Sequence, residues 1–206
     1  MTAMSVAAHL RLILASASPR RRELLAQTGL AFEVQPSGAN EDLVGDPLPV
    51  DAARELALRK ARWLRAEYAG QPRLLLGSDT IVALGECGAG RLLGKPENER
   101  EAREFLDLLS GTTHRVVTGV AVLRTTDGAE RVAHETTRVT MRELSEAERE
   151  AYVATGEWRD KAGGYAIQES ADAFVTQLQG GGFDNVVGLP VNLALGLIEE
   201  LGGAAQ

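Results

Sequence analysis

The chain has 206 residues, of which 44% are hydrophobic, 25% charged and 4% aromatic. This composition is typical of a globular protein with one sizeable core, and it argues against a disordered chain. Acidic residues outnumber basic ones by 29 to 22, which gives a formal net charge of −7. An acidic total argues against general binding to nucleic acid or to a membrane surface, but a local basic cluster could still hold a small anion.

The single cysteine, Cys87, excludes an intramolecular disulfide framework. No apolar run reaches the roughly 18 residues that a membrane span requires. The first residues lack the basic leader of a secretion signal. We therefore expect a cytoplasmic protein with one domain over residues 10–202 and loose ends at 1–9 and 203–206.

Short apolar or alternating runs predict the strands of the protein. They lie at 10–16, 31–36, 73–85, 91–94 and 113–144. Residues 73–85 are interpreted as a strand, a break and a second strand. Residues 113–144 are interpreted as two antiparallel strands joined at Asp127-Gly128, and a further hairpin is predicted around Gly180 to Gly182.

Apolar residues at every third or fourth position, together with capping residues, predict the helices. They lie at 18–29, 51–70, 97–111, 145–155 and 189–203. Ser18 and Pro19 suit the start of the first helix, and Ser145 with Glu148 forms a capping box. Because hairpins interrupt the alternation of strands and helices, we predict an α/β fold with a mixed sheet flanked by helices.

Three consecutive arginines, Arg20 to Arg22, occupy the first turn of the helix predicted at 18–29. Helix N-termini carry partial positive charge and unpaired N–H groups, so cations there are disfavoured by about 0.3–1 kcal/mol each. The segment therefore indicates an anion-binding site, for which a polyphosphate is the expected ligand. The alternative is that the arginines are solvated and paired with acids such as Glu23.

Three further charged residues stand out from their surroundings. Lys60 lies on the apolar stripe of its helix, where its ammonium either reaches back to solvent or points into a cleft. Asp79 interrupts an apolar run, where it either lines a cleft at the sheet edge or caps its own backbone in a turn. Lys95 in GRLLGKPE lacks the spacing of a phosphate loop but could contact a phosphate as a point charge.

Seven segments of the chain together carry a family resemblance. They are LASASPRRRELL (14–25), LALRKA (56–61), LGSDTIV (76–82), LGKP (93–96), LSGTTHRVVTG (109–119), DKAGGYAIQ (160–168) and NVVGLP (185–190). In this order and at these intervals they resemble the Maf family of nucleoside triphosphate pyrophosphatases, over residues 11 to 201. The resemblance implies a long twisted mixed sheet with a deep cleft, similar to the inosine triphosphate pyrophosphatases. It also implies cleavage of a nucleoside triphosphate to the monophosphate and pyrophosphate.

The resemblance also implies which residues form the site. At the specificity positions of the branch that acts on dTTP and UTP stand Arg20, Thr80 and Gln168. The residues expected to bind phosphate are Ser16, Ser18, Arg21, Lys60 and Lys95. Glu41 and Asp79 would hold a divalent cation, Mg²⁺ or Mn²⁺, since hard cations prefer oxygen ligands. Asp79 is also the expected catalytic residue, which would orient or deprotonate the attacking water.

Two positions depart from the family pattern. Asn40-Glu41 stands where the family usually has two acids, and Trp158 stands where many members have proline, at the expected rim of the cleft. The resemblance also implies a homodimer. Two other interpretations stay open: the same reaction on 7-methyl-GTP or another modified nucleotide, and a non-enzymatic regulator of septum formation.

Overall fold

A computed structural model describes residues 10–85 and 90–203 of the chain. Residues 1–9 and 204–206, which belong to the predicted loose ends, lie outside the described residues. The same is true of residues 86–89, which include Cys87 and lie between the strands predicted at 73–85 and 91–94.

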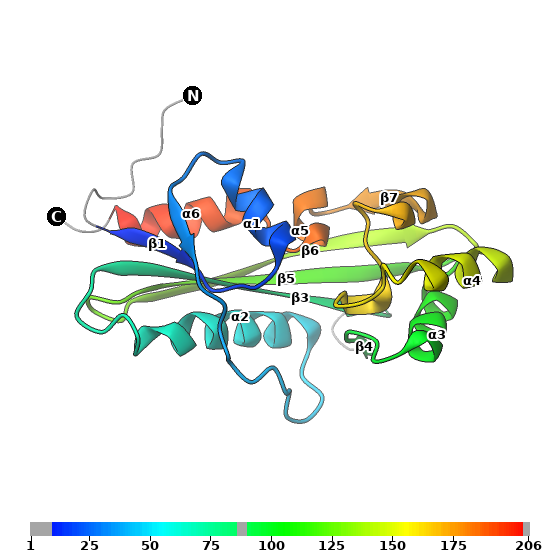
Figure 1. The fold of residues 1–206 in the computed structure, drawn as a ribbon, viewed down its shortest axis with the longest axis horizontal. Coiled ribbons are helices and arrows are strands. Elements are labelled where there is room, and N and C mark those ends of the chain that lie inside the picture. Colours follow the sequence, from blue (N-terminus) through cyan, green and yellow to red (C-terminus); the bar gives the residue numbers. More distant parts are fainter. Residues whose placement is uncertain (1–9, 86–89, 204–206) are drawn as a thin grey trace.

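A mixed sheet forms the centre of the molecule (Figure 1). In the described part its strands are β1 (Arg11–Leu14), β2 (Phe32–Val34), β3 (Arg73–Ala83), β4 (Leu92–Leu93), β5 (Thr113–Arg124), β6 (Glu130–Met141) and β7 (Val175–Gln179). Their order is β2-β1-β3-β5-β6-β7, with β4 paired to β3. β1 is parallel to both β2 and β3, whereas the other pairs are antiparallel. The predicted α/β fold with a mixed sheet is therefore confirmed.

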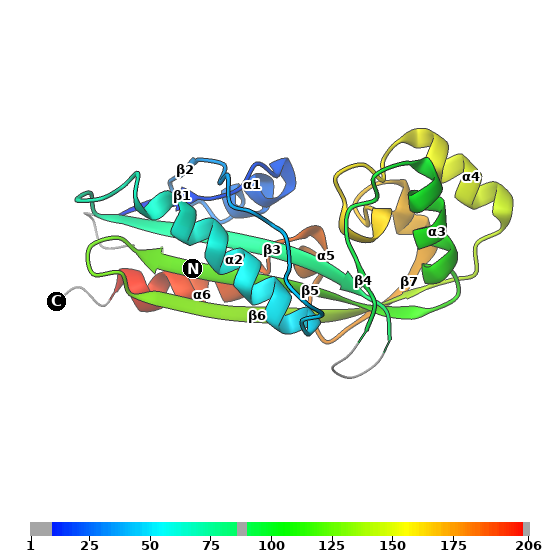
Figure 2. The same ribbon diagram turned by 90° about the horizontal axis from the view of Figure 1, so that it is seen from below.

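Helices cover both faces of the sheet (Figures 1 and 2). One face carries α2 (Pro49–Arg65), and the opposite face carries α1 (Pro19–Ala26), α5 (Phe183–Val187) and α6 (Val191–Gly202). We call this part the main lobe. At one end of the long strands lies the small lobe, formed by α3 (Glu99–Leu109), α4 (Glu146–Thr155), the 3-10 helices η1 (Ala162–Gly164) and η2 (Ser170–Phe174), and β7.

Local capping signals place the helix starts. The Ser18 hydroxyl accepts a hydrogen bond from the Arg21 N–H, and Pro19 is the first residue of α1. Ser145 and Glu148 form both halves of the predicted capping box of α4. Within residues 10–85 and 90–203, no helix combines the length and the apolar character needed to cross a bilayer.

Each lobe has its own apolar core. In the small lobe, Phe105, Leu106, Tyr152 and Trp158 belong to one buried cluster. In the main lobe, one cluster lies between the sheet and α6, and two others lie between the sheet and α2. The two lobes are thus separate packing units joined by the same strands.

β3 is one continuous strand, so the predicted break within residues 73–85 is wrong. Its pairing with β5 runs without interruption from Leu74 to Ala83. Gly77 within this strand is a point of close contact, because a Cβ built there would overlap the carbonyl oxygen of Ala57 in α2. A glycine is therefore required here because helix α2 lies close to the strand, and the chain makes no turn at this position.

The hairpin predicted around Gly180 to Gly182 is also wrong, because the chain after β7 forms α5. The side chain of Asp184 accepts hydrogen bonds from the backbone N–H groups of Asn185 and, at 2.7 Å, Val191. Asn185 is buried and donates to the Val116 carbonyl at 3.1 Å. These side-chain contacts hold the segment as a short helix that leads the chain back to the main lobe.

Candidate active site

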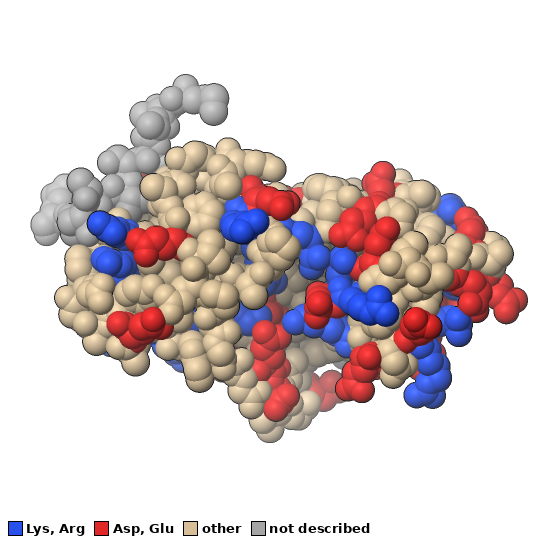
Figure 3. All heavy atoms as spheres, viewed as in Figure 1, with Lys and Arg blue, Asp and Glu red and all other residues tan. Residues whose placement is uncertain are grey.

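A cleft of about 670 Å³ opens between the two lobes, a size that suits a small-molecule ligand. Its walls come from the start of α1, the middle of β3 and residues 159–169. Charged side chains of both signs gather along this hollow (Figure 3). The six basic ones are Arg20, Arg21, Lys60, Lys95, Arg159 and Lys161, and the four acidic ones are Glu41, Asp79, Asp160 and Glu169. The cleft therefore carries an excess of positive charge, although the whole chain is acidic.

The strand pairing explains why the cleft lies at Asp79. β1 pairs with β3 only as far as Leu14 and Leu76, and β4 pairs with β3 at Val82 and Ala83. Among the described strands, none pairs with this edge of β3 between those two points. Asp79 therefore lies in the middle of a strand but at an open edge of the sheet.

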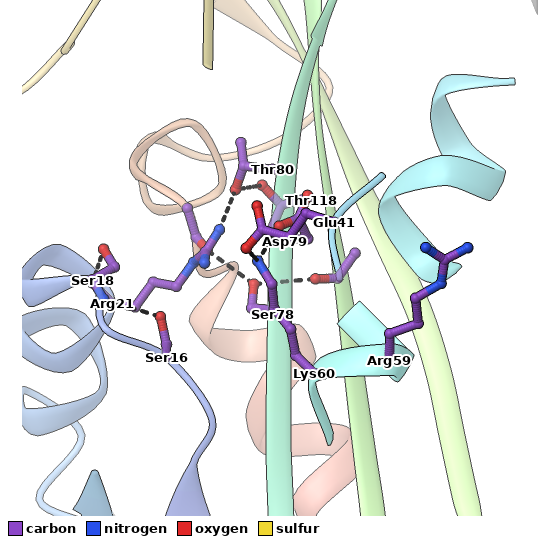
Figure 4. Close-up of polar contacts among 12 residues, drawn as sticks. Ser16, Ser18, Arg21, Glu41, Arg59, Lys60, Ser78, Asp79, Thr80 and Thr118 are labelled. Atoms are coloured by element: carbon purple, nitrogen blue, oxygen red, sulfur yellow. Dashed lines mark hydrogen bonds and ion pairs between the residues drawn. The ribbon is translucent and has the colours of Figure 1, made fainter. Parts of the chain in front are cut away.

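Neighbouring residues of β3 present their side chains to opposite faces of the sheet. Asp79 faces α2, where its carboxylate accepts a hydrogen bond from the Lys60 ammonium (Figure 4). The same Lys60 Nζ lies 2.9 Å from Glu41 Oε1. Lys60 is only 7% exposed, so of its two possible orientations the structure has the one that points into the cleft.

Arg21 reaches the opposite face of β3, where a chain of hydrogen bonds holds it. Its Nε donates to the Gly188 carbonyl at 2.7 Å, and its Nη2 donates to Thr80 Oγ1 at 3.0 Å. Thr80 in turn lies 3.0 Å from Thr118 Oγ1, which donates to the Asn185 carbonyl at 2.8 Å. Burial lowers the pKa of Arg21, and the nearby charge of Asp79 offsets this effect only in part.

Glu41 comes from the loop between β2 and α2 and completes the charged group around Lys60. Partial burial raises the pKa of the Glu41 carboxyl, but the hydrogen bond and charge of Lys60, together with Lys95, lower it by more. The net result is a pKa below the usual value. Lys95 is more exposed and lies 3.6 Å from Glu41 Oε2. Glu41 is therefore held as a carboxylate between two ammonium groups.

The start of α1 forms the remaining wall. Ser16 is buried, and its hydroxyl accepts a hydrogen bond from the Ser18 N–H at 3.2 Å. Arg20 and Arg21 line the cleft, whereas Arg22 is exposed and is not part of its lining. Cations from several elements thus surround one buried carboxylate, an arrangement that can bind a polyanion and stabilise the charge that develops when it is cleaved.

Residues 11–201 match the family described as Maf-like protein. The chain belongs to this family. Three relatives are similar to the Maf-like chain over almost its whole length, and each is named dTTP/UTP pyrophosphatase. The relative from Moorella thermoacetica is 49% identical over 88% of this chain and 90% of its own length. Those from Caulobacter vibrioides and Pelotomaculum thermopropionicum are 45% and 44% identical over 93% of this chain, and over 95% and 96% of their own lengths.

The cleft of this Maf-like protein brings together the side chains of every site residue that the sequence predicts. They are Ser16, Ser18, Arg20, Arg21, Glu41, Lys60, Asp79, Thr80, Lys95 and Gln168. Of the two departures, Asn40 is exposed, and its side chain accepts a hydrogen bond from the Asp42 N–H at 2.6 Å. Trp158 is buried in the core of the small lobe and is not among the lining residues, contrary to the expected place at the cleft rim.

Sequence reasoning missed four charged residues that line the Maf cleft, Arg159, Asp160, Lys161 and Glu169. Lys161 lies 3.4 Å from Glu169 and also donates to the Glu157 carbonyl. Asp160 has a φ of 60°, the only positive value outside glycine among the described residues. Such a conformation is costly and often found at functional sites. The segment DKAGGYAIQ lies in this region and carries part of the family resemblance, but only its last residue, Gln168, is predicted to belong to the site.

Glu41 and Asp79 fit a divalent cation shared with a ligand. Both carboxylates contact a single ammonium, so a positive charge already lies between them. The described residues contain no group of three or more His, Cys, Asp or Glu side chains that could hold a metal ion. Mg²⁺ is commonly bound through one or two carboxylates plus substrate phosphates, and this donor set meets that need.

Proposed function

We propose that the protein is a nucleoside triphosphate pyrophosphatase that hydrolyses dTTP and UTP to the nucleoside monophosphate and pyrophosphate. The observation that carries this proposal is the similarity to the three relatives of that name, which spans most of both chains. The cleft supplies the chemistry such a reaction needs, because basic side chains from both lobes line the same cleft as Asp79.

The basic residues and the start of α1 serve the triphosphate. Arg21, held by Gly188 and Thr80, presents a fixed positive charge at the open edge of β3. Ser16, Ser18, Lys60 and Lys95 supply the other phosphate contacts. The charges of Arg21, Lys60 and Lys95 are opposite to the one that grows on the departing pyrophosphate, so they lower the energy of the transition state.

Asp79 is the catalytic residue of the proposed reaction. Its carboxylate orients a water molecule toward the α-phosphorus and accepts a proton from it. The water oxygen forms a bond to that phosphorus while the bond to the bridging oxygen breaks, and pyrophosphate leaves with the electron pair. Glu41 and Asp79 would hold Mg²⁺ or Mn²⁺, which would neutralise phosphate charge and acidify bound water.

Gln168 serves the base in this proposal, together with Arg20 and Thr80. Its side chain is exposed at the cleft. A carboxamide both donates and accepts hydrogen bonds, as does the imide edge of thymine and uracil. Thr80 acts on the base less directly, since its hydroxyl is already bonded to Arg21 and Thr118.

A panel of triphosphates tests the proposal. The protein is incubated with Mg²⁺ or Mn²⁺ and dTTP, UTP, dCTP, GTP, ATP or 7-methyl-GTP, and the release of pyrophosphate and of the monophosphate is measured. We expect dTTP and UTP to give the highest kcat/KM, with the two products in equal amounts. Replacing Gln168 by Ala should lower the dTTP-to-GTP ratio of kcat/KM by about tenfold, the worth of one buried hydrogen bond. Release of inorganic phosphate, or preference for a purine, would contradict the proposal.

A further inference from the structure

Arg159 differs from most of the cations in the cleft. Lys60, Lys95 and Lys161 each lie within 4 Å of a carboxylate, and Arg21 is hydrogen-bonded to a carbonyl and a hydroxyl. Arg20 and Arg159 have neither an ion pair nor a side-chain hydrogen bond within the described ranges. Of these two, only Arg159 comes from the small lobe, between α4 and η1.

The guanidinium of Arg159 is nevertheless held in place. Its central carbon lies 4.7 Å from the centroid of the Trp158 ring, in a cation–π contact. Trp158 itself is 4% exposed, and its indole N–H donates to the Val153 carbonyl at 3.0 Å. Gly156 lies beside the guanidinium, and a Cβ built on it would overlap Arg159 Nη1. Arg159 is exposed, but its guanidinium lies against the Trp158 ring, and no carboxylate among the described residues pairs with its N–H groups.

Such an arrangement suits an oxyanion in the cleft. A guanidinium that is stacked on a ring still directs its N–H donors outward in its own plane, where they match two oxygens of a phosphate. Arg159 belongs to the small lobe, whereas the lining residues of α1 and α2 belong to the main lobe. Among the described residues, no hydrogen bond or ion pair joins Arg159 to the group around Asp79, where the reacting phosphorus would lie.

We propose that Arg159 binds the phosphates of the substrate that leave as pyrophosphate, and that Trp158 is its positioning residue. This inference rests on the proposed function, since it assigns Arg159 to the leaving group of that reaction. Arg159 acts by binding and not by proton transfer. Because charge grows on the pyrophosphate as it leaves, loss of Arg159 raises KM and also lowers kcat.

Direct binding of inorganic pyrophosphate tests the proposal. Isothermal titration calorimetry is carried out on the wild-type protein and on the Arg159→Gln and Arg159→Lys variants. We expect Arg159→Gln to weaken pyrophosphate binding about tenfold and to lower kcat/KM for dTTP by at least a similar factor. Arg159→Lys should fall between the two, because it keeps the charge but loses the planar fork and much of the stacking.

Arg100→Gln is the matched control. Arg100 also belongs to the small lobe, but its side chain is 81% exposed and it is not a cleft residue. This variant loses the same charge and should bind pyrophosphate within twofold of the wild type. An equal loss in Arg100→Gln would reduce the effect of Arg159 to long-range electrostatics and overturn the proposal.

Fluorescence tests the role of Trp158 separately. The chain has two tryptophans, so in a Trp63→Phe background the emission reports on Trp158 alone. We expect pyrophosphate to change this emission, and the change to be lost when Arg159→Gln is added. An unchanged response in the double variant would overturn the positioning role.

The two proposals can fail independently. Pyrophosphate binding that does not depend on Arg159, in an enzyme that cleaves dTTP, would overturn the inference and leave the proposed function intact. A protein that binds pyrophosphate through Arg159 but cleaves no triphosphate would overturn the proposed function. If Arg159→Gln weakened binding of thymidine and not of pyrophosphate, the residue would belong to the nucleoside end of the cleft and the inference would be wrong.

Discussion

Lys60 is 7% exposed, and its ammonium contacts the carboxylates of Glu41 and Asp79. Burying a charge in this way is costly unless it is paired, and a divalent cation between the same carboxylates would require part of the same space. Lys60 and such a cation would therefore compete for Glu41 and Asp79 in the nucleotide-free protein. Once phosphates enter the cleft, they offer the ammonium another partner.

Replacing Lys60 by Met should therefore tighten the binding of Mn²⁺ to the nucleotide-free protein by about tenfold or more, because two carboxylates lose their internal counter-charge. Titration followed by electron paramagnetic resonance measures free Mn²⁺ directly. Lys95→Met is the control, since Lys95 is exposed and lies 3.6 Å from Glu41, and it should change the affinity less than threefold. Unchanged or weaker Mn²⁺ binding in Lys60→Met would contradict the competition.

Asp79→Asn separates catalysis from folding. The amide has nearly the size of the carboxylate, and Lys60 keeps its contact with Glu41, so the variant should fold. It cannot accept a proton from water, so kcat for dTTP should fall by a factor on the order of 10²–10⁴. Pyrophosphate release and the circular dichroism spectrum are the two measurements.

Asp42→Asn is the control for this variant. Asp42 is exposed in the same loop as Glu41 and is not among the cleft residues, so its replacement should leave kcat within twofold. Hydrolysis of dTTP by Asp79→Asn at close to the wild-type rate would remove Asp79 from the mechanism.

Two of the site residues could be recognised in the sequence because they are charged residues at otherwise apolar positions. Lys60 and Asp79 break a helical stripe and an apolar run, and both lie in the cleft. Arg159 gives no such signal, because an arginine in an irregular polar segment is ordinary. Its special environment depends on the burial of Trp158, which no periodicity in residues 156–170 reveals.

At the scale of elements, two glycines in the sheet allow helix α2 to pack closely against it. A Cβ on Gly77 of β3 would overlap the Ala57 carbonyl, and one on Gly119 of β5 would overlap the Ala53 carbonyl. The atoms in the way are backbone, so they cannot move aside without displacing the helix. Because α2 also carries Lys60, these contacts set the distance between Lys60 and Asp79.

Gly77→Ala should therefore destabilise the protein by about 3 kcal/mol and lower dTTP hydrolysis as α2 shifts outward. Urea unfolding at neutral pH measures the free energy. Gly196→Ala is the control, because Gly196 lies in α6 with nothing within 4 Å of its added Cβ. That change should stabilise the protein by about 1 kcal/mol, the difference in helix propensity. Wild-type stability in Gly77→Ala would contradict the close approach.

Elements fixed by local signals could be predicted, and those fixed by distant contacts could not. The starts of α1 and α4 follow from Ser18 and from Ser145, whose caps involve residues three positions away. The continuity of β3 and the helix α5 depend on partners more than forty residues away, among them Gly119 for Ser78 and Val116 for Asn185. A glycine-rich stretch gives the same sequence pattern for a turn as for a close contact.

At the scale of the whole molecule, the cleft and the surface have opposite character. The chain carries a net charge of −7, yet the side chains that line the cleft are six basic against four acidic. The acidic composition by itself argues only against general binding to large anionic partners such as nucleic acid. The sheet and the two lobes assemble distant basic residues into one place, so a local field suited to a small polyphosphate exists within an acidic protein.

The stability of the whole molecule should depend on the pH through one buried histidine. His114 of β5 is 0% exposed, and its Nε2 lies 2.8 Å from the hydroxyl of Tyr165 in the cleft wall. Burial lowers the pKa of His114 from 6.5 to about 4. As the pH falls, the unfolded chain therefore takes up a proton before the folded one does. The associated stability is complete above pH 6.5 and is lost as the pH falls toward 4.

The expected loss is on the order of 3 kcal/mol over this window. Urea unfolding at pH 7.0, 6.0 and 5.0 measures the upper part of this loss, about 2 kcal/mol, at pH values above the usual pKa of carboxylates. His114→Gln keeps a hydrogen-bonding partner for Tyr165 and cannot be protonated, so its stability should be nearly constant from pH 7.0 to 5.0, whatever its absolute value. His134→Gln is the control: His134 is exposed on β6, so most of the slope should remain. An equally steep loss in His114→Gln would place the pH sensitivity elsewhere.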